Sequence, residues 1–368
     1  YTDKWSLKSE LEIEHNMLDG DGDYDGEVEL EQAYVNYHAG NWGFKAGVIL
    51  TSVGYINETH EPPTFLSVER PDYAKYVIPT TWFGNGFGFY GKVSGIDWKI
   101  NIMEDLKASG IGDGIRDARG KGYKTTAYDW TKNIRLDYNE MPGINIGGSM
   151  TMNNAPATFK DDGTVDEDID LSLAKESIGV SLIEFHGSYN ANNLTATMEY
   201  GTISYTDNEA ADGTSGYYLD VGYDISEMVS CEGKLIPWIR YGNVQKDVDD
   251  SSSHYDVMKF GLSYFPIDQI AFKLDYGTKA YENDDDNRYG CAFDCMGACQ
   301  YNPYIQCSNV EDCRVQDPYN ENECDPSTGV NCIDWGTCNY SQFTYDPVGS
   351  DLEYFNEFLG KCSNGFCI

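Results

Sequence analysis

The chain has 368 residues, of which 61 are acidic and 25 are basic, so its formal net charge is −36. This acidity excludes a sequence-independent nucleic-acid binder, because the chain would repel phosphate backbones. A helical membrane protein is also excluded, since no apolar run reaches the ~18–20 residues that a membrane-spanning helix needs. Aromatic residues make up 14% of the chain, which is enough apolar material for a folded protein and argues against disorder.

Apolar and polar residues alternate in segment after segment between residues 7 and 281. In the last segment, Phe272 and Leu274 belong to one face, while Lys273 and Asp275 belong to the other. A period of two is typical of a β-strand with one apolar and one polar face, so the fold class is all-β. About thirteen such segments occur. They include residues 7–13, 42–50, 87–93, 98–102, 130–138, 144–150, 183–189, 194–200, 217–223, 235–241, 258–264 and 269–281.

Two all-β architectures fit this alternation. In a soluble sandwich the apolar faces form the core, whereas in an antiparallel transmembrane β-barrel they meet lipid and the polar faces line a wet lumen. Charged residues in the middle of successive segments, aromatic residues near segment ends and a length beyond ~250–300 residues favour the barrel. With a closing strand added, we expect about 14–16 strands with long extracellular loops. Residues 1–290 would form this barrel.

One connector, at residues 54–81, is far longer than a hairpin turn and contains Pro62, Pro63, Pro71 and Pro79. Long connections in compact proteins are commonly functional. One interpretation places this segment inside the barrel, where it would shape the lumen. The other interpretation makes it an ordinary external loop.

Several sequence motifs occur together in one known family. They are GEVELEQAY at 26–34, NETHEPPTFLSVERPDYAKYVIPTTW at 57–82, GIRDARGKG at 114–122, LIPWIRY at 235–241 and GLSYFPIDQIAFKLDY at 261–276. This set resembles the bacterial outer-membrane porins related to the phosphate-selective (O/P-type) porin family, over roughly residues 5–281. The resemblance implies a water-filled channel in the bacterial cell outer membrane, surrounded by the lipid bilayer, for passive diffusion of ions and small hydrophilic solutes. It also implies a homotrimer, and basic residues that draw anions through the narrowest part.

Nine basic residues are candidates for lining the pore and setting its selectivity. In chain order they are Lys45, Arg70, Lys75, Lys99, Arg116, Arg119, Lys121, Arg135 and Lys273. Some belong to the long connector or to the dense basic cluster at 116–121, and the others are directed into the lumen by alternation. Acidic residues share the same polar faces, so we expect a general or weakly selective channel, with a cation preference if the net charge dominates. The alternative for each charge is simple solvation of a wet wall.

An acidic segment nearly copies a calcium-binding loop. Asp21, Asp23 and Asp25 stand at loop positions one, three and five and a Gly at six, but position twelve, normally Glu, is Gln32. Two interpretations stay open. The segment is either a calcium site formed by Asp21, Asp23, Asp25 and Glu27, or an acidic hairpin turn. We expect no required cofactor, and in the first interpretation calcium would only stabilise the turn.

Ten of the eleven cysteines fall in one polar stretch near the end of the sequence. They are Cys291, Cys295, Cys299, Cys307, Cys313, Cys324, Cys332, Cys338, Cys362 and Cys367. This density predicts disulfides formed in an oxidising compartment, with a metal site as the weaker alternative. Residues 291–368 are therefore expected to be a disulfide-stapled segment, atypical of the porin family, to which the closing strand could belong.

Enzymatic chemistry finds little support in the sequence. The five histidines are scattered, and neither a nucleophile elbow nor a paired metal-ligand motif occurs. We therefore expect a protein that is not an enzyme. The competing hypothesis is a secreted or surface-exposed, disulfide-rich β-protein that binds calcium or glycans.

Overall fold

The computed structural model describes residues 2–13, 28–112, 114–123, 126–160, 165–166 and 174–282, and the backbone of short strands between 297 and 367. The chain divides into two compact units. One comprises Tyr1–Tyr276 and Tyr281–Asp284, and the other Gly277–Ala280 and Asp285–Ile368. No helix in the described part of the chain is long and apolar enough to span a membrane.

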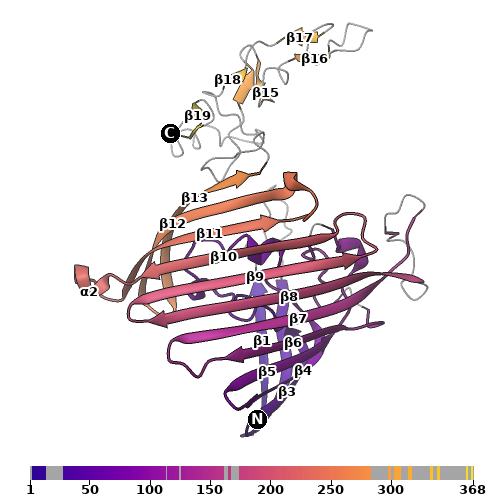
Figure 1. Ribbon diagram of the computed structural model, residues 1–368, viewed down its shortest axis with the longest axis vertical. Helices are drawn as coiled ribbons and strands as arrows, with labels where there is room; N and C mark the ends of the chain where they lie inside the picture. Colours follow the sequence, from indigo (N-terminus) through magenta and orange to yellow (C-terminus); the bar gives the residue numbers. More distant parts are fainter. Residues whose placement is uncertain are drawn as a thin grey trace. The chain divides into compact units, whose positions relative to one another are not determined.

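The first unit is built on one thirteen-stranded antiparallel sheet, in which strands adjacent in the sequence are also adjacent in the sheet (Figure 1). Its strands are β1 (Trp5–Ile13), β2 (Val28–Ala39), β3 (Trp42–Leu50), β4 (Phe83–Val93), β5 (Ile96–Met103), β6 (Thr131–Tyr138), β7 (Ile144–Ala157), β8 (Glu176–Ala191), β9 (Leu194–Thr206), β10 (Gly213–Tyr223), β11 (Lys234–Gln245), β12 (His254–Ile267) and β13 (Ile270–Tyr281). The all-β prediction is confirmed.

The helices in the described part of this unit are all short. They are η2 (Pro62–Thr64), α1 (Tyr73–Tyr76), η3 (Ala108–Gly110), α2 (Ser226–Val229) and η5 (Ser251–Ser253). The described strands of the second unit form three small sheets, with strand orders β15–β14–β18, β16–β17 and β19–β20. Their strands are β14 (Gly297–Cys299), β15 (Asn302–Cys307), β16 (Arg314–Gln316), β17 (Cys332–Asp334), β18 (Cys338–Asn339), β19 (Cys362–Ser363) and β20 (Phe366–Cys367).

The strand number of the described sheet is thirteen, one below the expected range of about 14–16. An up-and-down sheet with an odd number of strands has its first and last strands, β1 and β13, running in the same direction. These two strands therefore cannot pair with each other in the antiparallel manner, and among the described strands each has a neighbour on one side only. A fourteenth strand that would close a barrel is not among the described strands of this sheet.

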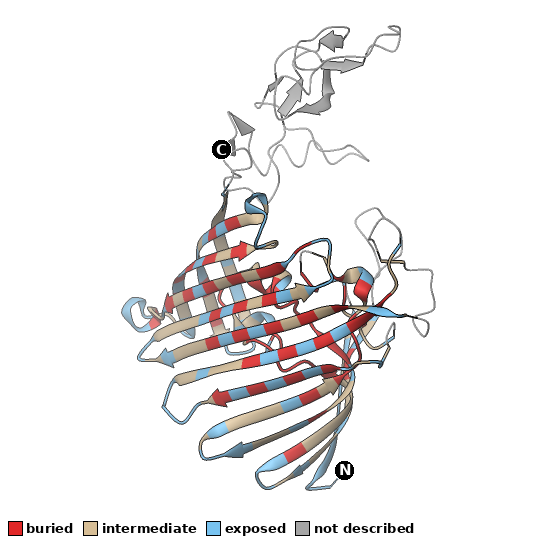
Figure 2. Ribbon diagram, turned by 45° about the vertical axis from the view of Figure 1, so that its right-hand side comes forward, coloured by how far each residue is buried: buried red, intermediate tan, exposed pale blue. Residues whose placement is uncertain are grey.

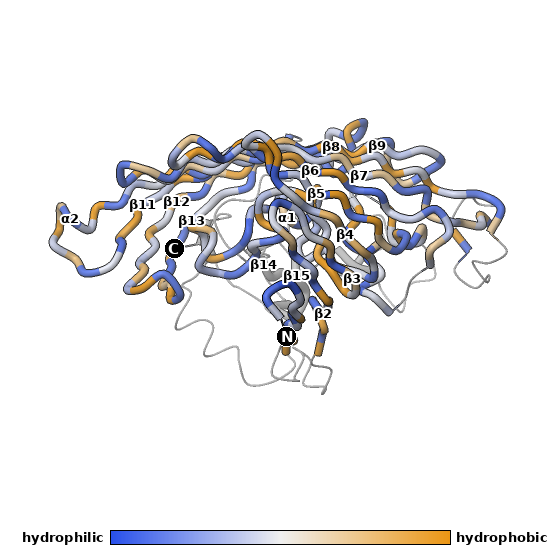
Figure 3. The backbone as a smooth tube through the Cα atoms, turned by 90° about the horizontal axis from the view of Figure 1, so that it is seen from below, coloured by the Kyte–Doolittle hydropathy of each residue, from blue (hydrophilic) through white to orange (hydrophobic). Residues whose placement is uncertain are grey.

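Alternation along each strand separates two faces of the sheet. On β6, Asn133, Arg135 and Asp137 are buried, whereas Ile134 and Leu136 are 45% and 49% exposed. The same red and pale blue alternation runs along neighbouring strands in Figure 2. The sheet curves around the connectors that lie inside it (Figure 3). Buried side chains of the sheet pack against these connectors and so belong to its concave face, whereas the exposed apolar side chains that alternate with them belong to the convex face. A soluble core would bury these apolar side chains, so the exposed band on the convex face is the pattern of a lipid-facing barrel wall.

At one end of the concave face the inward side chains are apolar, contrary to the expectation of a uniformly polar lining. Ile178, Val180 and Leu182 of β8 are buried in a hydrophobic cluster with Val77 and Ile115, which belong to two long connectors. Those connectors, residues 51–82 and 104–130, cover this end of the sheet, so apolar residues are needed there to pack against them.

Candidate channel-lining site

The connector at residues 51–82 lies on the concave face, which confirms the interpretation of this segment as an inner loop. We call it the inner loop. Its backbone meets wall carboxylates on distant strands: Tyr55 N–H donates to Glu199 Oε2 at 2.7 Å, and Val68 N–H donates to Asp275 Oδ2 at 2.7 Å. These contacts reach from β9 to β13, so the inner loop crosses a large part of the inner wall.

Lys273 on β13 fixes the middle of the inner loop. Its Nζ donates to the carbonyl oxygens of Phe65 at 2.6 Å and Ser67 at 2.9 Å, and also to that of Pro62. Three backbone acceptors occupy the three protons of an ammonium group. Lys273, which the sequence predicted to line a pore, therefore holds the inner loop against the wall.

A buried charge network holds the start of the inner loop. Arg135 on β6 pairs with both carboxylate oxygens of Asp137, at 2.8 Å and 2.9 Å, and donates to the carbonyl oxygen of Gly54. On β8, Glu184 Oε2 accepts the Gly54 N–H at 3.3 Å, and its Oε1 is 2.7 Å from Nδ1 of His186. Both backbone groups of Gly54 are thus bound to wall side chains. Such a paired and hydrogen-bonded set resists rearrangement, because removing any member leaves a buried charge.

Gly147 makes this network possible. Asp137, Gly147 and His186 stand opposite one another on β6, β7 and β8, so they share the concave face. Asp137 Oδ1 contacts His186 Nε2 at 2.7 Å, directly across the intervening strand. A Cβ atom at Gly147 would lie 2.6 Å from His186 Nε2 and 2.7 Å from Asp137 Oδ1, so only glycine leaves room for the contact.

A second pair of oppositely charged groups borders a cavity of about 380 Å³ on the inner wall. Lys99 Nζ on β5 is 2.6 Å from Glu58 Oε2 of the inner loop, and Arg135 Nη1 is 3.5 Å from the same oxygen. Burial alone would raise the pKa of Glu58, but the positive charges of Lys99, Lys45 and Arg135 outweigh it and hold that pKa below its usual value. Lys8, Lys45 and Lys99 all line the cavity, so this part of the wall is basic.

The basic cluster at residues 116–121 lies against the end of the inner loop. Arg116 Nη1 donates to the carbonyl oxygen of Thr80 at 3.3 Å, and Arg119 Nη1 donates to that of Thr81. Burial lowers the pKa of Arg119 to about 10. Lys121 pairs with Glu29 on β2. These cations connect the second connector to the inner loop and to the wall.

The nine predicted residues thus fall into separate groups. Lys45, Lys99 and Arg135 come together around Glu58, and the cluster at residues 116–121 holds the end of the inner loop. Of the two loop residues, Lys75 is exposed, with Nζ 5.2 Å from the ring centre of Tyr76, and Arg70 is half-buried. Whether any of them sets selectivity stays a prediction.

The calcium prediction at residues 21–27 lies outside the described residues, and the side chains of the ten clustered cysteines are not described either. Among the described residues, Cys231 is a free thiol.

The sequence interpretation missed the role of two carboxylates, Glu58 and Glu199. Glu199 accepts the Tyr55 N–H and, through Oε1, the hydroxyl of Tyr218 at 2.7 Å. Its inward direction follows from alternation on β9, since Met198 and Tyr200 on either side are exposed. Its partner is a loop backbone group, and no sequence signal gives the path of that loop.

Comparisons with known proteins point to the same architecture. No family model matches the chain. An uncharacterized protein of Aquifex aeolicus (strain VF5) is 29% identical over 307 residues, which cover 78% of this chain and 69% of that protein. Among solved structures, OmpF of Salmonella typhi in complex with daunomycin is similar with a TM-score of 0.51 and 12% identity, covering 77% of this chain and 81% of OmpF. A loop L8 deletion mutant of OmpT, an outer membrane protein of Vibrio cholerae, has a TM-score of 0.50 and 12% identity, covering 77% and 82%. The chain therefore has the fold of the outer-membrane β-barrel porins.

Proposed function

We propose that the protein is an outer-membrane channel for passive diffusion of ions and small hydrophilic solutes, with general or weak selectivity. The observation that carries this proposal is the inner loop, which is held on the concave wall by charged side chains from Arg135 on β6 to Lys273 on β13. A loop fixed across a polar wall narrows a passage while leaving wet, charged surfaces beside it. As a passive channel, the protein would carry out no bond chemistry.

The polar spaces beside the inner loop support a route for solutes. The basic cavity of about 380 Å³ lies near Glu58. A second cavity of about 410 Å³ is lined by loop residues, including Tyr55 and Phe65, by Asp220 on β10, and by Asp224, Lys234 and Asp268 at the ends of strands. One space is basic and the other carries carboxylates, which favours weak charge selectivity over a strict preference for one sign.

The convex face supports a place in the outer membrane. Leu136, Phe185 and Phe260 are 49%, 57% and 57% exposed, and each alternates with inward-facing neighbours on its strand. Exposed apolar side chains on so many strands would be costly in water but match a lipid surface. The homotrimer implied by the sequence resemblance is retained as part of this proposal.

Osmotic swelling of liposomes tests the proposal. Purified protein would be reconstituted into vesicles and exposed to neutral sugars of increasing size and to charged solutes of matched size. We expect swelling rates that fall with solute size and differ only a few-fold between anions and cations. Vesicles containing heat-denatured protein are the control. No swelling with any solute, or uptake of phosphate alone, would contradict the proposed function.

A further inference from the structure

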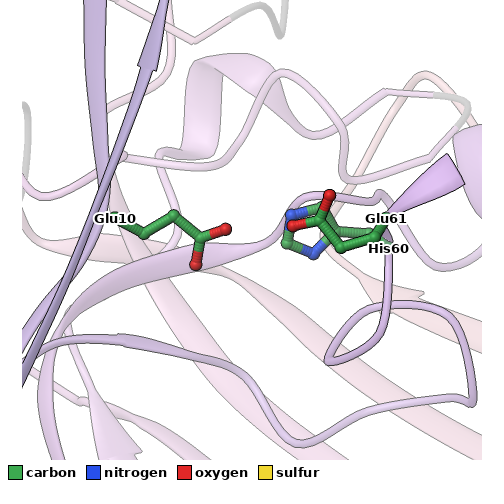
Figure 4. A group of neighbouring side chains, drawn as sticks. All are labelled: Glu10, His60 and Glu61. Atoms are coloured by element: carbon green, nitrogen blue, oxygen red, sulfur yellow. The ribbon is translucent and has the colours of Figure 1, made fainter. Parts of the chain in front are cut away.

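A group of potential metal ligands lies where the inner loop meets β1. It consists of Glu10 on β1 and His60 and Glu61 on the inner loop, and one ligand atom from each lies within 4.8 Å of the others. In Figure 4 the carboxylate of Glu10 points toward the imidazole of His60 and the carboxylate of Glu61. Two carboxylates and one imidazole from two separate parts of the fold therefore converge on one small space.

The surroundings of His60 are those of a metal-binding histidine. The residue is only 8% exposed, and its Nδ1 is 3.2 Å from the carbonyl oxygen of Asn57. A carbonyl oxygen only accepts, so Nδ1 carries a proton. Nε2 lies 3.1 Å from Glu31 Oε2, which is also an acceptor, so the ring carries both protons and pairs with Glu31. A metal ion at Nε2 would replace the proton that now faces Glu31, and the neighbouring carboxylate favours a positive charge at that position. A backbone carbonyl that orients the far side of the ring is the usual second partner of a metal-bound histidine.

A β-bulge brings additional polar groups to this place. Glu10 pairs with Gln32 and Leu11 pairs with Leu30, so Glu31 has no partner across the β1–β2 ladder. A bulge of this kind turns two consecutive side chains to the same face. Glu31 and Gln32 are both buried, and they contact His60 and Glu10, respectively. The bulge thus places a carboxylate beside Nε2 of the imidazole, and an amide that orients the carboxylate of Glu10.

The local charge also favours a cation. A second set of carboxylates, Glu12, Glu29 and Glu31, converges within 4.8 Å next to the first. Two lysines approach the carboxylates of this corner, Lys8 at 3.5 Å from Glu10 and Lys121 beside Glu29. Arg70 and Arg119 are also near, since their charges act on His60 and Glu29, respectively. Among the described residues, five carboxylates therefore face four basic side chains, and a divalent ion would offset the remaining excess.

We propose that Glu10, His60 and Glu61 bind one divalent transition-metal ion of the zinc type, which links the inner loop to β1. The mixed donor set decides the class of ion, because an imidazole suits zinc and its neighbours, whereas calcium and magnesium take oxygen donors. The site is distinct from the acidic sequence at residues 21–27, which contains no imidazole. The proposal does not depend on channel activity, since the ion would stabilise the folded chain whether or not solutes pass.

The test is zinc titration of the full-length, detergent-solubilised protein after treatment with a chelator. Isothermal titration calorimetry gives the affinity, and the melting temperature reports stabilisation. We expect wild-type protein to gain a zinc-dependent rise in melting temperature, and His60→Gln and Glu61→Gln to bind this ion at least about tenfold more weakly. The buried His60→Gln variant could fail to fold. Because Glu61 is exposed, Glu61→Gln should fold in either case and keeps the test decisive. Any zinc bound elsewhere in the chain is common to wild type and both variants, so the difference between them reports on this site.

His254→Gln is the matched control. His254 also faces a carboxylate, with Nδ1 2.8 Å from Glu282 Oε2, but no described third ligand converges on that pair. This variant should bind zinc as wild type does. Equal zinc affinity in wild type, His60→Gln and Glu61→Gln would overturn the proposal. Calcium stabilisation equal to that of zinc would also overturn it. A melting temperature of the wild type that no metal changes would do the same, because the His60–Glu31 contact would then be an ion pair alone.

Discussion

Replacing Arg240 with Met tests whether buried ion pairs on the concave wall hold the structure together. Arg240 on β11 is 1% exposed and binds Asp220 on β10 in a bidentate pair, with both N–O distances at 2.6 Å. The substitution leaves the Asp220 carboxylate, itself 4% exposed, without its partner. Removing one partner of a buried ion pair leaves the other charge buried and unpaired, which costs about 3–5 kcal/mol. The free energy of unfolding should therefore fall by about that amount. The double variant Arg240→Met/Asp220→Leu should lose less than either single variant, because an apolar pair no longer buries a charge.

Urea unfolding in detergent, followed by tryptophan fluorescence, measures these differences. Trp238 lies 5.7 Å from the Arg240 guanidinium and reports on this part of the wall. Lys259→Met is the matched control, because Lys259 on β12 stands directly opposite Arg240. The substitution removes a like charge from the position opposite Arg240, so stability should be unchanged or slightly higher. A loss of unfolding free energy in the double variant equal to the sum of the two single losses would refute the reasoning, because the two side chains would then contribute independently.

Four further predictions concern the inner loop, the two faces of the sheet and the turn after β10. Glu58→Gln should shift the reversal potential in a salt gradient toward anions, and Lys99→Gln should shift it toward cations, because the two groups form one pair at 2.6 Å. Gly147→Ala should lower the free energy of unfolding by about 1–3 kcal/mol through overpacking, measurable by urea titration; an unchanged value would contradict the close contact across β7. Leu136→Arg should cost up to about 2–4 kcal/mol when folding is measured in lipid vesicles, and no loss would argue against a lipid-facing surface. Burial would raise the pKa of Asp224, but hydrogen bonds from two backbone N–H groups hold it below its usual value. The resulting stabilisation is present above about pH 3.9 and is lost as the pH falls through the lowered pKa, so Asp224→Ala should flatten melting temperature against pH in that range.

Strand positions and faces were predictable because side-chain direction in a strand has a period of two. Residues 131–138 illustrate this, since alternation directs Arg135 and Asp137 inward and both are buried. The exception is the end of β8, where Ile178 and Val180 also face inward but are apolar. Alternation alone cannot show that the connectors pack against this end of the sheet, where the buried contact requires apolar side chains.

The pairing of the charges was not predictable from the sequence. Asp137 meets His186 across an intervening strand, and the contact depends on the register of three strands and on a glycine between them. Lys273 was expected to face solutes, but it binds backbone carbonyls more than 200 residues away in the chain. Such contacts depend on the path of a long loop, which local patterns do not encode.

Single-channel recording in planar lipid bilayers tests the central claim most directly. Addition of the purified, detergent-solubilised protein should give stepwise increases in conductance of uniform size, with a weak charge preference in a salt gradient. The heat-denatured protein should give none. Absence of conductance steps from folded protein, together with full solubility without detergent, would contradict the account of this chain as an outer-membrane channel.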